Sequence, residues 1–379
     1  MFVFQFLQHL LISALVGYLS FTNVLAEKIE VILTPSHNEK NVVTADVKEN
    51  ILEAVSNTTQ SLHASLPKIL LEHAEYQQAA IQASQKKEAN GFNIDDIPLS
   101  DAVSDALVNI YCQYKTDTYI RTTTGTGFFI NAKGVIITNA HVAQFLLLED
   151  NVDAQDKIEC VIRSGNPASP KYIAELLYIS PIWIFNNSTV ITSESPSGTG
   201  ERDYALLYIS KSVDSTPLPA HFPAIPVDTT LLSRSTEGST VLTAGYPAED
   251  LMRQGADAKL ASVVAQTTVG ALYTFGSNYA DLFSISESLV GEHGASGGPI
   301  VNTDLKSTIG LIVTKGDPAT EGEHSLRALT ISYIDRTIQE ETGFSLAQNM
   351  QGDIAYRGAI FKKAMAPFLA QILVDELEH

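Results

Sequence analysis

The sequence predicts an all-β core of two antiparallel β-barrels, with helical segments before and after it. Short β-branched or apolar runs, separated by turn residues, recur between about residues 108 and 314 and are typical of antiparallel strands. A proline-rich stretch, residues 212–236, divides these runs into two groups, as a connector between barrels would. Apolar residues at helical spacing lie on both sides of the core and predict the helical segments.

Each group supplies several short strand candidates. The first group has six, at 108–115, 125–131, 134–139, 157–163, 171–179 and 204–209. The second group has five, at 240–244, 261–268, 281–286, 300–302 and 308–314. Within the first group, residues 181–200 are rich in Asn, Ser and Gly, which predicts an exposed loop.

The helical patterns begin near residue 46 and return near the C-terminus. Residues 46–90 carry an apolar face, 98–105 predict a short helix before the first strand, and 335–350 and 353–378 predict two C-terminal helices. The segment 46–90 fits a packing helix, a pro-segment or an oligomer contact. Packing against the C-terminal helices is favoured, because both segments have apolar faces that need partners.

Composition narrows the function classes. The 379 residues are 45% hydrophobic and 18% charged, which fits a globular protein. The net charge of −19 speaks against nucleic-acid binding, which needs a basic surface. Two cysteines cannot form a four-ligand zinc site, and no His, Cys and Asp residues follow metal-ligand spacing, so no metal is expected.

The N-terminal segment predicts export. Residues 1–26 are almost free of charge and end in Val24, Leu25 and Ala26, which is typical of a secretory signal peptide. The apolar run is also long enough for a membrane anchor. Cleavage is favoured, so the expected location is secreted, periplasmic or in the cell envelope, with a membrane as partner only if the segment is uncleaved.

Ser296 lies in the stretch from Gly291 to Asn302, which reads GEHGASGGPIVN. Glycine permits backbone conformations that a Cβ forbids, so this stretch predicts a sharp turn that presents the serine. The amides of Gly294 and Ser296 are placed to point at one oxygen, as an oxyanion hole requires. A serine hydroxyl becomes a nucleophile only with a base in hydrogen-bond reach.

Two upstream motifs supply the missing partners. His141 follows the strand candidate 134–139, and Asp203 opens the run DYALLYI. Each motif alone is weak, because glycine-rich turns, single histidines and such strand openings are common. Their combination and their order along the chain favour a Ser-His-Asp catalytic triad.

Together these motifs resemble chymotrypsin-like (trypsin-like) serine proteases, and in style the bacterial Deg/HtrA-type protease domains. The family signatures are G-x-S-G-G-P, G-x-G-F-x-I followed by T-A-A-H, and D-[IL]-A-L-L. Here Asn139 replaces the first alanine of T-A-A-H, and residues 241–247, VLTAGYP, resemble the opening of the second barrel. The resemblance covers about residues 105–335. It implies two six-stranded Greek-key barrels with the active site in the cleft between them.

The implied organisation has six parts. They are a signal peptide or membrane anchor (1–26), a helical extension (27–104), the first barrel (105–211), the linker (212–236), the second barrel (237–332) and C-terminal helices (333–379). The last part has 47 residues, which is too few for the PDZ domain of many bacterial relatives.

The resemblance implies a serine endopeptidase that acts on proteins or peptides through an acyl-enzyme, without a cofactor. The alternative is a catalytically silent, protease-like binding protein. An α/β-hydrolase elbow is excluded, because Pro299 and a strand follow the serine instead of a helix. The downstream histidines, His324 and His379, also do not fit that fold.

The resemblance also suggests substrate-pocket residues. Val290 aligns near the pocket floor, where an apolar residue argues against Lys or Arg and favours a medium apolar P1 residue. His293 is placed at the pocket mouth or in a solvated loop, and Thr314 lies on the expected wall strand. Ala295 replaces the acid that pairs with a new N-terminus in trypsin, so activation should not need that ion pair.

The same resemblance places the two cysteines on neighbouring strands. Cys112 and Cys160 lie on the expected first and fourth strands of the first barrel, which are adjacent in this Greek key. A disulfide between them is expected in an oxidising compartment. Two buried free thiols, which pack as small apolar groups, are the other possibility.

Overall fold

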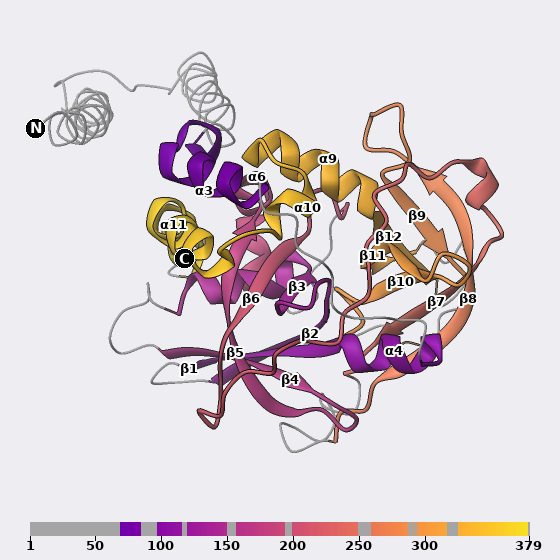
Figure 1. Cartoon of the computed structure of the whole chain (residues 1–379), viewed down its shortest axis with the longest axis horizontal. Helices are drawn as coiled ribbons and strands as arrows, with labels where there is room; N and C mark the ends of the chain where they lie inside the picture. The colour runs from indigo at the N-terminus through magenta and orange to yellow at the C-terminus, as the bar shows by residue number, and fades with distance from the viewer. Residues whose placement is uncertain are drawn as a thin grey trace, which may run out of the picture. The chain divides into compact units, whose positions relative to one another are not determined.

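Two closed antiparallel barrels of six strands each form the core, as the sequence predicts (Figure 1). The computed structural model describes residues 69–84, 97–115, 120–149, 157–193, 199–248, 259–286, 290, 294–316 and 325–377. The expected signal peptide and most of the segment 46–90 lie outside these ranges. Among the helices of the described ranges, none is long and apolar enough to cross a membrane.

The first barrel has the strand order β1-β2-β3-β6-β5-β4. Its strands are β1 Leu107–Lys115, β2 Ile120–Phe129, β3 Val135–Thr138, β4 Lys157–Ser164, β5 Ser169–Ile179 and β6 Ala205–Ser212. All six strand candidates of the first group are therefore strands. Their inward side chains belong to one large buried apolar core that extends to the C-terminal helices.

The second barrel has the order β10-β11-β12-β9-β8-β7. Its strands are β7 Thr240–Gly245, β8 Val263–Tyr273, β9 Leu282–Ile285, β10 Pro299–Asn302, β11 Ser307–Lys315 and β12 Leu326–Thr330. Strand β12 is absent from the sequence-based candidates. Its residues LRALT include a single β-branched residue, and pairing with β9 and β11 makes it a strand.

The prediction of an exposed loop at 181–200 is wrong for its first part. Residues 181–193 form helix α6 Pro181–Asn187 and the 3₁₀ helix η3 Ser188–Thr192, and α6 packs against α12. The Ser180 side chain accepts a hydrogen bond from the Trp183 amide at 3.2 Å, and Pro181 occupies the first turn. Serine followed by proline is a helix-start signal, and the buried Trp183 holds the helix on the core.

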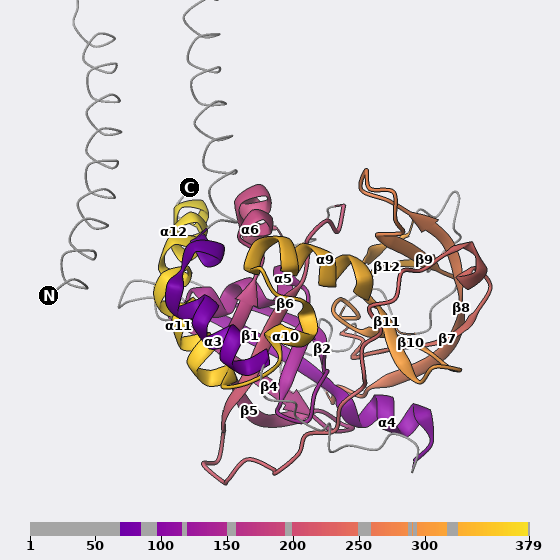
Figure 2. The same cartoon turned by 45° about the horizontal axis from the view of Figure 1, so that its top comes forward.

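The C-terminal part contains four helices where two were expected. They are α9 Ile331–Thr342, α10 Leu346–Asn349, α11 Ile354–Ala364 and α12 Ala366–Leu377. Gly343, with φ of 82°, ends α9, and Ser345 and Asp353 cap the starts of α10 and α11. Helix α11 packs against β5 and β6 of the first barrel, whereas α9 packs on β11 and β12 of the second (Figure 2).

Helices α3 Ala74–Ser84 and α4 Leu99–Ala106 precede the first barrel in the described part of the chain. Helix α3 lies on the C-terminal helices, where the Tyr76 hydroxyl donates to Asn349 Oδ1 at 3.0 Å. The Gln77 side-chain amide donates to the Thr342 carbonyl at 3.0 Å. These contacts favour the packing interpretation for residues 69–84.

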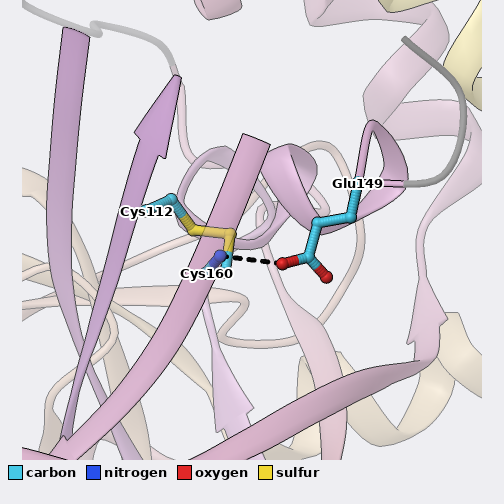
Figure 3. Close-up of a disulfide and its surroundings, with 3 residues drawn as sticks. All are labelled: Cys112, Glu149 and Cys160. Atoms are coloured by element: carbon cyan, nitrogen blue, oxygen red, sulfur yellow. Dashed lines mark hydrogen bonds between the residues drawn. A yellow bond between two sulfur atoms is a disulfide. The ribbon is translucent and has the colours of Figure 1, made fainter. Parts of the chain in front are cut away.

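The Cys112–Cys160 disulfide is present and joins β1 to β4 (Figure 3). The two residues are direct cross-strand partners, and their Cα atoms are 4.0 Å apart. The Cys160 amide donates to Glu149 Oε1 at 2.7 Å. The predicted disulfide is confirmed, and the alternative of two free thiols is excluded.

Candidate active site

His141 and Asp203 meet at one end of the first barrel. His141 lies on the one-turn helix α5 Ala140–Ala143, directly after β3, and Asp203 lies two residues before β6. His141 Nδ1 is 2.7 Å from Asp203 Oδ2, and the His141 amide donates to Asp203 Oδ1 at 2.9 Å. Both carboxylate oxygens therefore orient the histidine. The contact favours the tautomer with its proton on Nδ1, which leaves Nε2 as the basic nitrogen.

Asn139 holds the main chain of the acid. Its side-chain amide donates to the Asp203 carbonyl at 2.9 Å, and the residue is fully buried. The sequence marks Asn139 only as a departure from the family pattern and assigns it no role. In the structure it ties the α5 start to the turn that carries Asp203.

Ser296 lies in the loop between the barrels' facing ends, just before β10. Its carbonyl accepts a hydrogen bond from the Thr126 amide on β2 at 2.8 Å, so the loop is attached to the first barrel. On the second-barrel side, the Gly297 amide donates to the Ile312 carbonyl at 2.9 Å. The serine is thus held by main-chain hydrogen bonds from both barrels.

Thr126 is the main link between the barrels at this site. Its hydroxyl donates to the Gly294 carbonyl at 2.5 Å and accepts from the Tyr246 amide at 2.9 Å. Its carbonyl accepts from the hydroxyl of Thr138, the last residue of β3, at 2.7 Å. Because β3 leads directly to His141, Thr126 places the serine loop beside the strand end that carries the histidine. The motif containing Thr126 was recognised from the sequence, but this role was not.

The loop's glycines are required by space and by backbone conformation. Gly297 has φ of +86°, and a Cβ there would lie 2.0 Å from the Thr126 carbonyl oxygen. Gly294 has φ of +82°, and its Cβ would lie 2.4 Å from the Tyr246 carbonyl oxygen. A side chain at Gly297 would push the serine loop away from β2 of the first barrel, and one at Gly294 would push it away from the segment that follows β7.

The serine hydroxyl and the histidine are not hydrogen-bonded to each other in the described part of the chain. The amides of Gly294 and Ser296 likewise donate to no group within those residues. Contacts between nucleophile and base are often long without substrate and tighten in the complex. Two such amides on one turn are the donors that an oxyanion hole requires.

The structure describes two of the three residues predicted to form the substrate pocket. Val290 is fully buried, and a Cβ on Gly245 would lie 2.8 Å from its Cγ1, so it packs beneath the end of β7. Thr314 is half-buried on β11, and His293 lies outside the described residues. The pocket assignment stays a prediction.

Among the residues that the structure describes, no three His, Cys, Asp or Glu side chains are grouped to hold a metal ion.

Comparison with known proteins identifies the core. Residues 125–311 match the family model described as the trypsin-like peptidase domain. This region is a trypsin-like peptidase domain. The matched range contains His141, Asp203 and Ser296, while β1 and β12 of the barrels lie outside it.

The chain is also similar to proteins of solved structure. One is the Rv3671c protease from M. tuberculosis in its active form, with 16% sequence identity and a TM-score of 0.39. The match covers 68% of this chain and 89% of that one. No curated protein matches the sequence.

Proposed function

We propose that this chain is a serine endopeptidase that cleaves peptide bonds through an acyl-enzyme at Ser296. One observation carries the proposal. The carboxylate of Asp203 holds His141 at both its amide and its Nδ1, at the strand end that Thr126 and Thr138 link to the serine loop. A serine, a base and an orienting acid on rigid strand ends are the elements of nucleophilic acyl transfer.

The chemistry follows from these positions. Ser296 Oγ attacks the carbonyl carbon of a peptide, and its proton passes to His141 Nε2. The oxyanion accepts hydrogen bonds from the amides of Gly294 and Ser296. The C–N bond then breaks, and His141 returns the proton to the leaving amine. Water repeats the sequence on the acyl-enzyme, with His141 taking its proton, and releases the acid and Ser296.

The expected substrates are proteins or peptides, with a medium apolar P1 residue favoured by Val290. The expected location is outside the reducing cytosol, in secreted, periplasmic or cell-envelope form. The Cys112–Cys160 bond supports this location, because disulfides persist in oxidising compartments. Ala295 offers no carboxylate to a new N-terminus, so activity should not depend on such an ion pair.

Replacing Ser296 by Ala tests the proposal. Peptide hydrolysis should fall by about 10⁶-fold with the fold retained, because members of a triad act as a unit. A fluorophosphonate probe should label the wild type and not Ser296→Ala, while Ser235→Ala, an exposed serine in η4 Arg234–Thr236, should be labelled fully. Absence of labelling and hydrolysis in the wild type would favour the catalytically silent binding protein.

A further inference from the structure

The residue before Asp203 has an unusual backbone conformation. Arg202 has φ of 56°, in the left-handed region that side chains other than glycine seldom occupy. The turn around it is tight, since the Asp203 amide donates to the Gly200 carbonyl at 3.1 Å and the Tyr204 amide to the Arg202 carbonyl at 2.9 Å. The direction in which Asp203 leaves this turn therefore depends on what keeps Arg202 in place.

Helix α9 holds Arg202 at both its main chain and its side chain. The Arg202 amide donates to the Tyr333 hydroxyl at 3.2 Å. Its guanidinium donates to Glu341 and, at 2.9 Å, to Glu340. The Glu340 side chain is 62% exposed and that of Glu341 only 1%, so the pair with Glu341 is the stronger constraint.

The Glu341 carboxylate is fully used by buried partners. The hydroxyls of Tyr178 and Ser180, at the end of β5, donate to it together with Arg202. Burial raises the pKa of Glu341, and the charge of Arg202 acts in the opposite direction. A buried ion pair stabilises a fold little more than apolar side chains of the same size would. The advantage of this pair is the fixed direction that it imposes on Arg202.

Helix α9 also connects the two barrels. It begins at Ile331, directly after β12 of the second barrel, and packs on β11 and β12. Glu341, near its other end, reaches β5 and the Arg202 turn of the first barrel. In Figures 1 and 2 the helix runs between these two parts of the molecule.

We propose that Glu341 positions Asp203 through Arg202, so that helix α9 belongs to the catalytic apparatus although it contacts no substrate. This inference rests on the proposed function, because it gives Asp203 the role of orienting His141. Without the buried carboxylate, the bonds to Tyr333 and to the exposed Glu340 hold Arg202 less firmly, and it leaves its left-handed conformation. The Asp203 carboxylate then turns away from His141 Nδ1.

Glu341→Gln in the full chain tests the inference, since it keeps the size of the side chain and removes its charge. The kcat should fall about 10- to 100-fold with KM changed less than about twofold, as expected for a small misplacement of a catalytic group. Arg336→Gln is the matched control. It breaks the ion pair between α9 and the buried Asp281 of the second barrel, and leaves Tyr333, Glu340 and Glu341 in place. This control should lower the melting temperature and leave kcat unchanged.

A measurement independent of hydrolysis separates this inference from the proposed function. The hydrogen-bonded Nδ1 proton of His141 should give a low-field NMR signal in the wild type and in Arg336→Gln, and lose it in Glu341→Gln. If the wild type hydrolyses no peptide, the proposed function fails, and the NMR signal still tests the positioning by Glu341.

A second variant tests the inference if Glu341→Gln does not fold. Arg202→Lys keeps the buried charge balance but lacks the planar fork of donors, so a smaller loss of kcat with unchanged KM is expected. Variants of Glu341 or Arg202 with lowered melting temperature, wild-type kcat and an intact His141 signal would overturn the proposal. The ion pair would then be structural only.

Discussion

The two barrels hold their parts of the candidate active site by different means. In the first barrel, side chains hold the site residues. The Asp203 carboxylate is hydrogen-bonded to His141, and the Asn139 side-chain amide donates to the Asp203 carbonyl. In the second barrel, the groups that are held belong to the backbone, since main-chain hydrogen bonds, the Thr126 hydroxyl on the Gly294 carbonyl and the close contact of Gly297 with Thr126 fix the Ser296 loop. A side-chain contact can be weakened in steps, whereas a glycine in close contact tolerates no added atom.

The chemical roles of the two parts explain why the barrels hold them differently. A base needs one tautomer and one ring direction, which a carboxylate side chain supplies. An oxyanion hole needs main-chain amides turned outward and left without partners, which only an unusual backbone conformation supplies. The comparison predicts that substitutions in the Ser296 loop lower activity more than single substitutions around Asp203.

Among variants that keep Ser296, His141 and Asp203, the largest effect is expected from Gly297→Ala. The added Cβ meets the Thr126 carbonyl oxygen at 2.0 Å, so the loop and its amides must shift. Loss of an oxyanion donor costs on the order of 10²- to 10³-fold in kcat, and a similar loss is expected. Gly238→Ala is the control, because Gly238 has φ of +79° with nothing within 4 Å of its Cβ position. Equal losses in both variants would show that backbone strain, not the contact with Thr126, decides the effect.

A smaller effect is expected from Asn139→Ala, which restores the residue of the family pattern. It removes the hydrogen bond to the Asp203 carbonyl at 2.9 Å and leaves the carboxylate contacts in place. The expected loss in kcat/KM is about three- to tenfold, equivalent to one ordinary hydrogen bond. Asn187→Ala removes a comparable bond in α6, from a side-chain amide to the Trp183 carbonyl at 2.9 Å, and should leave kcat/KM unchanged. Full activity of Asn139→Ala would mean that the carboxylate contacts alone hold Asp203.

The smallest effect on catalysis is expected from removal of the disulfide. Replacing Cys112 and Cys160 by Ser should lower the free energy of unfolding by about 2–4 kcal/mol, because the bond closes a loop of 48 residues. The kcat should stay within about twofold, since the disulfide joins β1 to β4 and neither His141 nor Ser296 lies on these strands. Urea unfolding and peptide hydrolysis measure the two quantities, and reduced wild type is the control. A loss of kcat without a loss of stability would contradict this separation.

Most of the fold could be predicted because its signals are local. β-Branched runs bounded by turns marked eleven of the twelve strands of the described barrels. At Ser180 and Pro181 the local signal of a helix start lies in a stretch whose Asn, Ser and Gly content predicts a loop. Strand β12 carries little local signal, and its pairing with β9 and β11 alone defines it.

The sequence by itself determined which residues are the candidates for catalysis. Ser296, His141 and Asp203 could be named because each lies in a short motif whose glycines, strand and turn are neighbours in the chain. The cysteine pair could be named because the order of strands in the fold implies which strands are adjacent.

Only the tertiary structure decided what holds these elements together. Thr126 reaches the serine loop across 168 residues of chain, and Arg202 reaches Glu341 across 139. No local pattern marks such pairs, because each side chain alone is an ordinary threonine, arginine or glutamate. Their roles arise when burial removes water and leaves each donor with the acceptor that the fold brings to it.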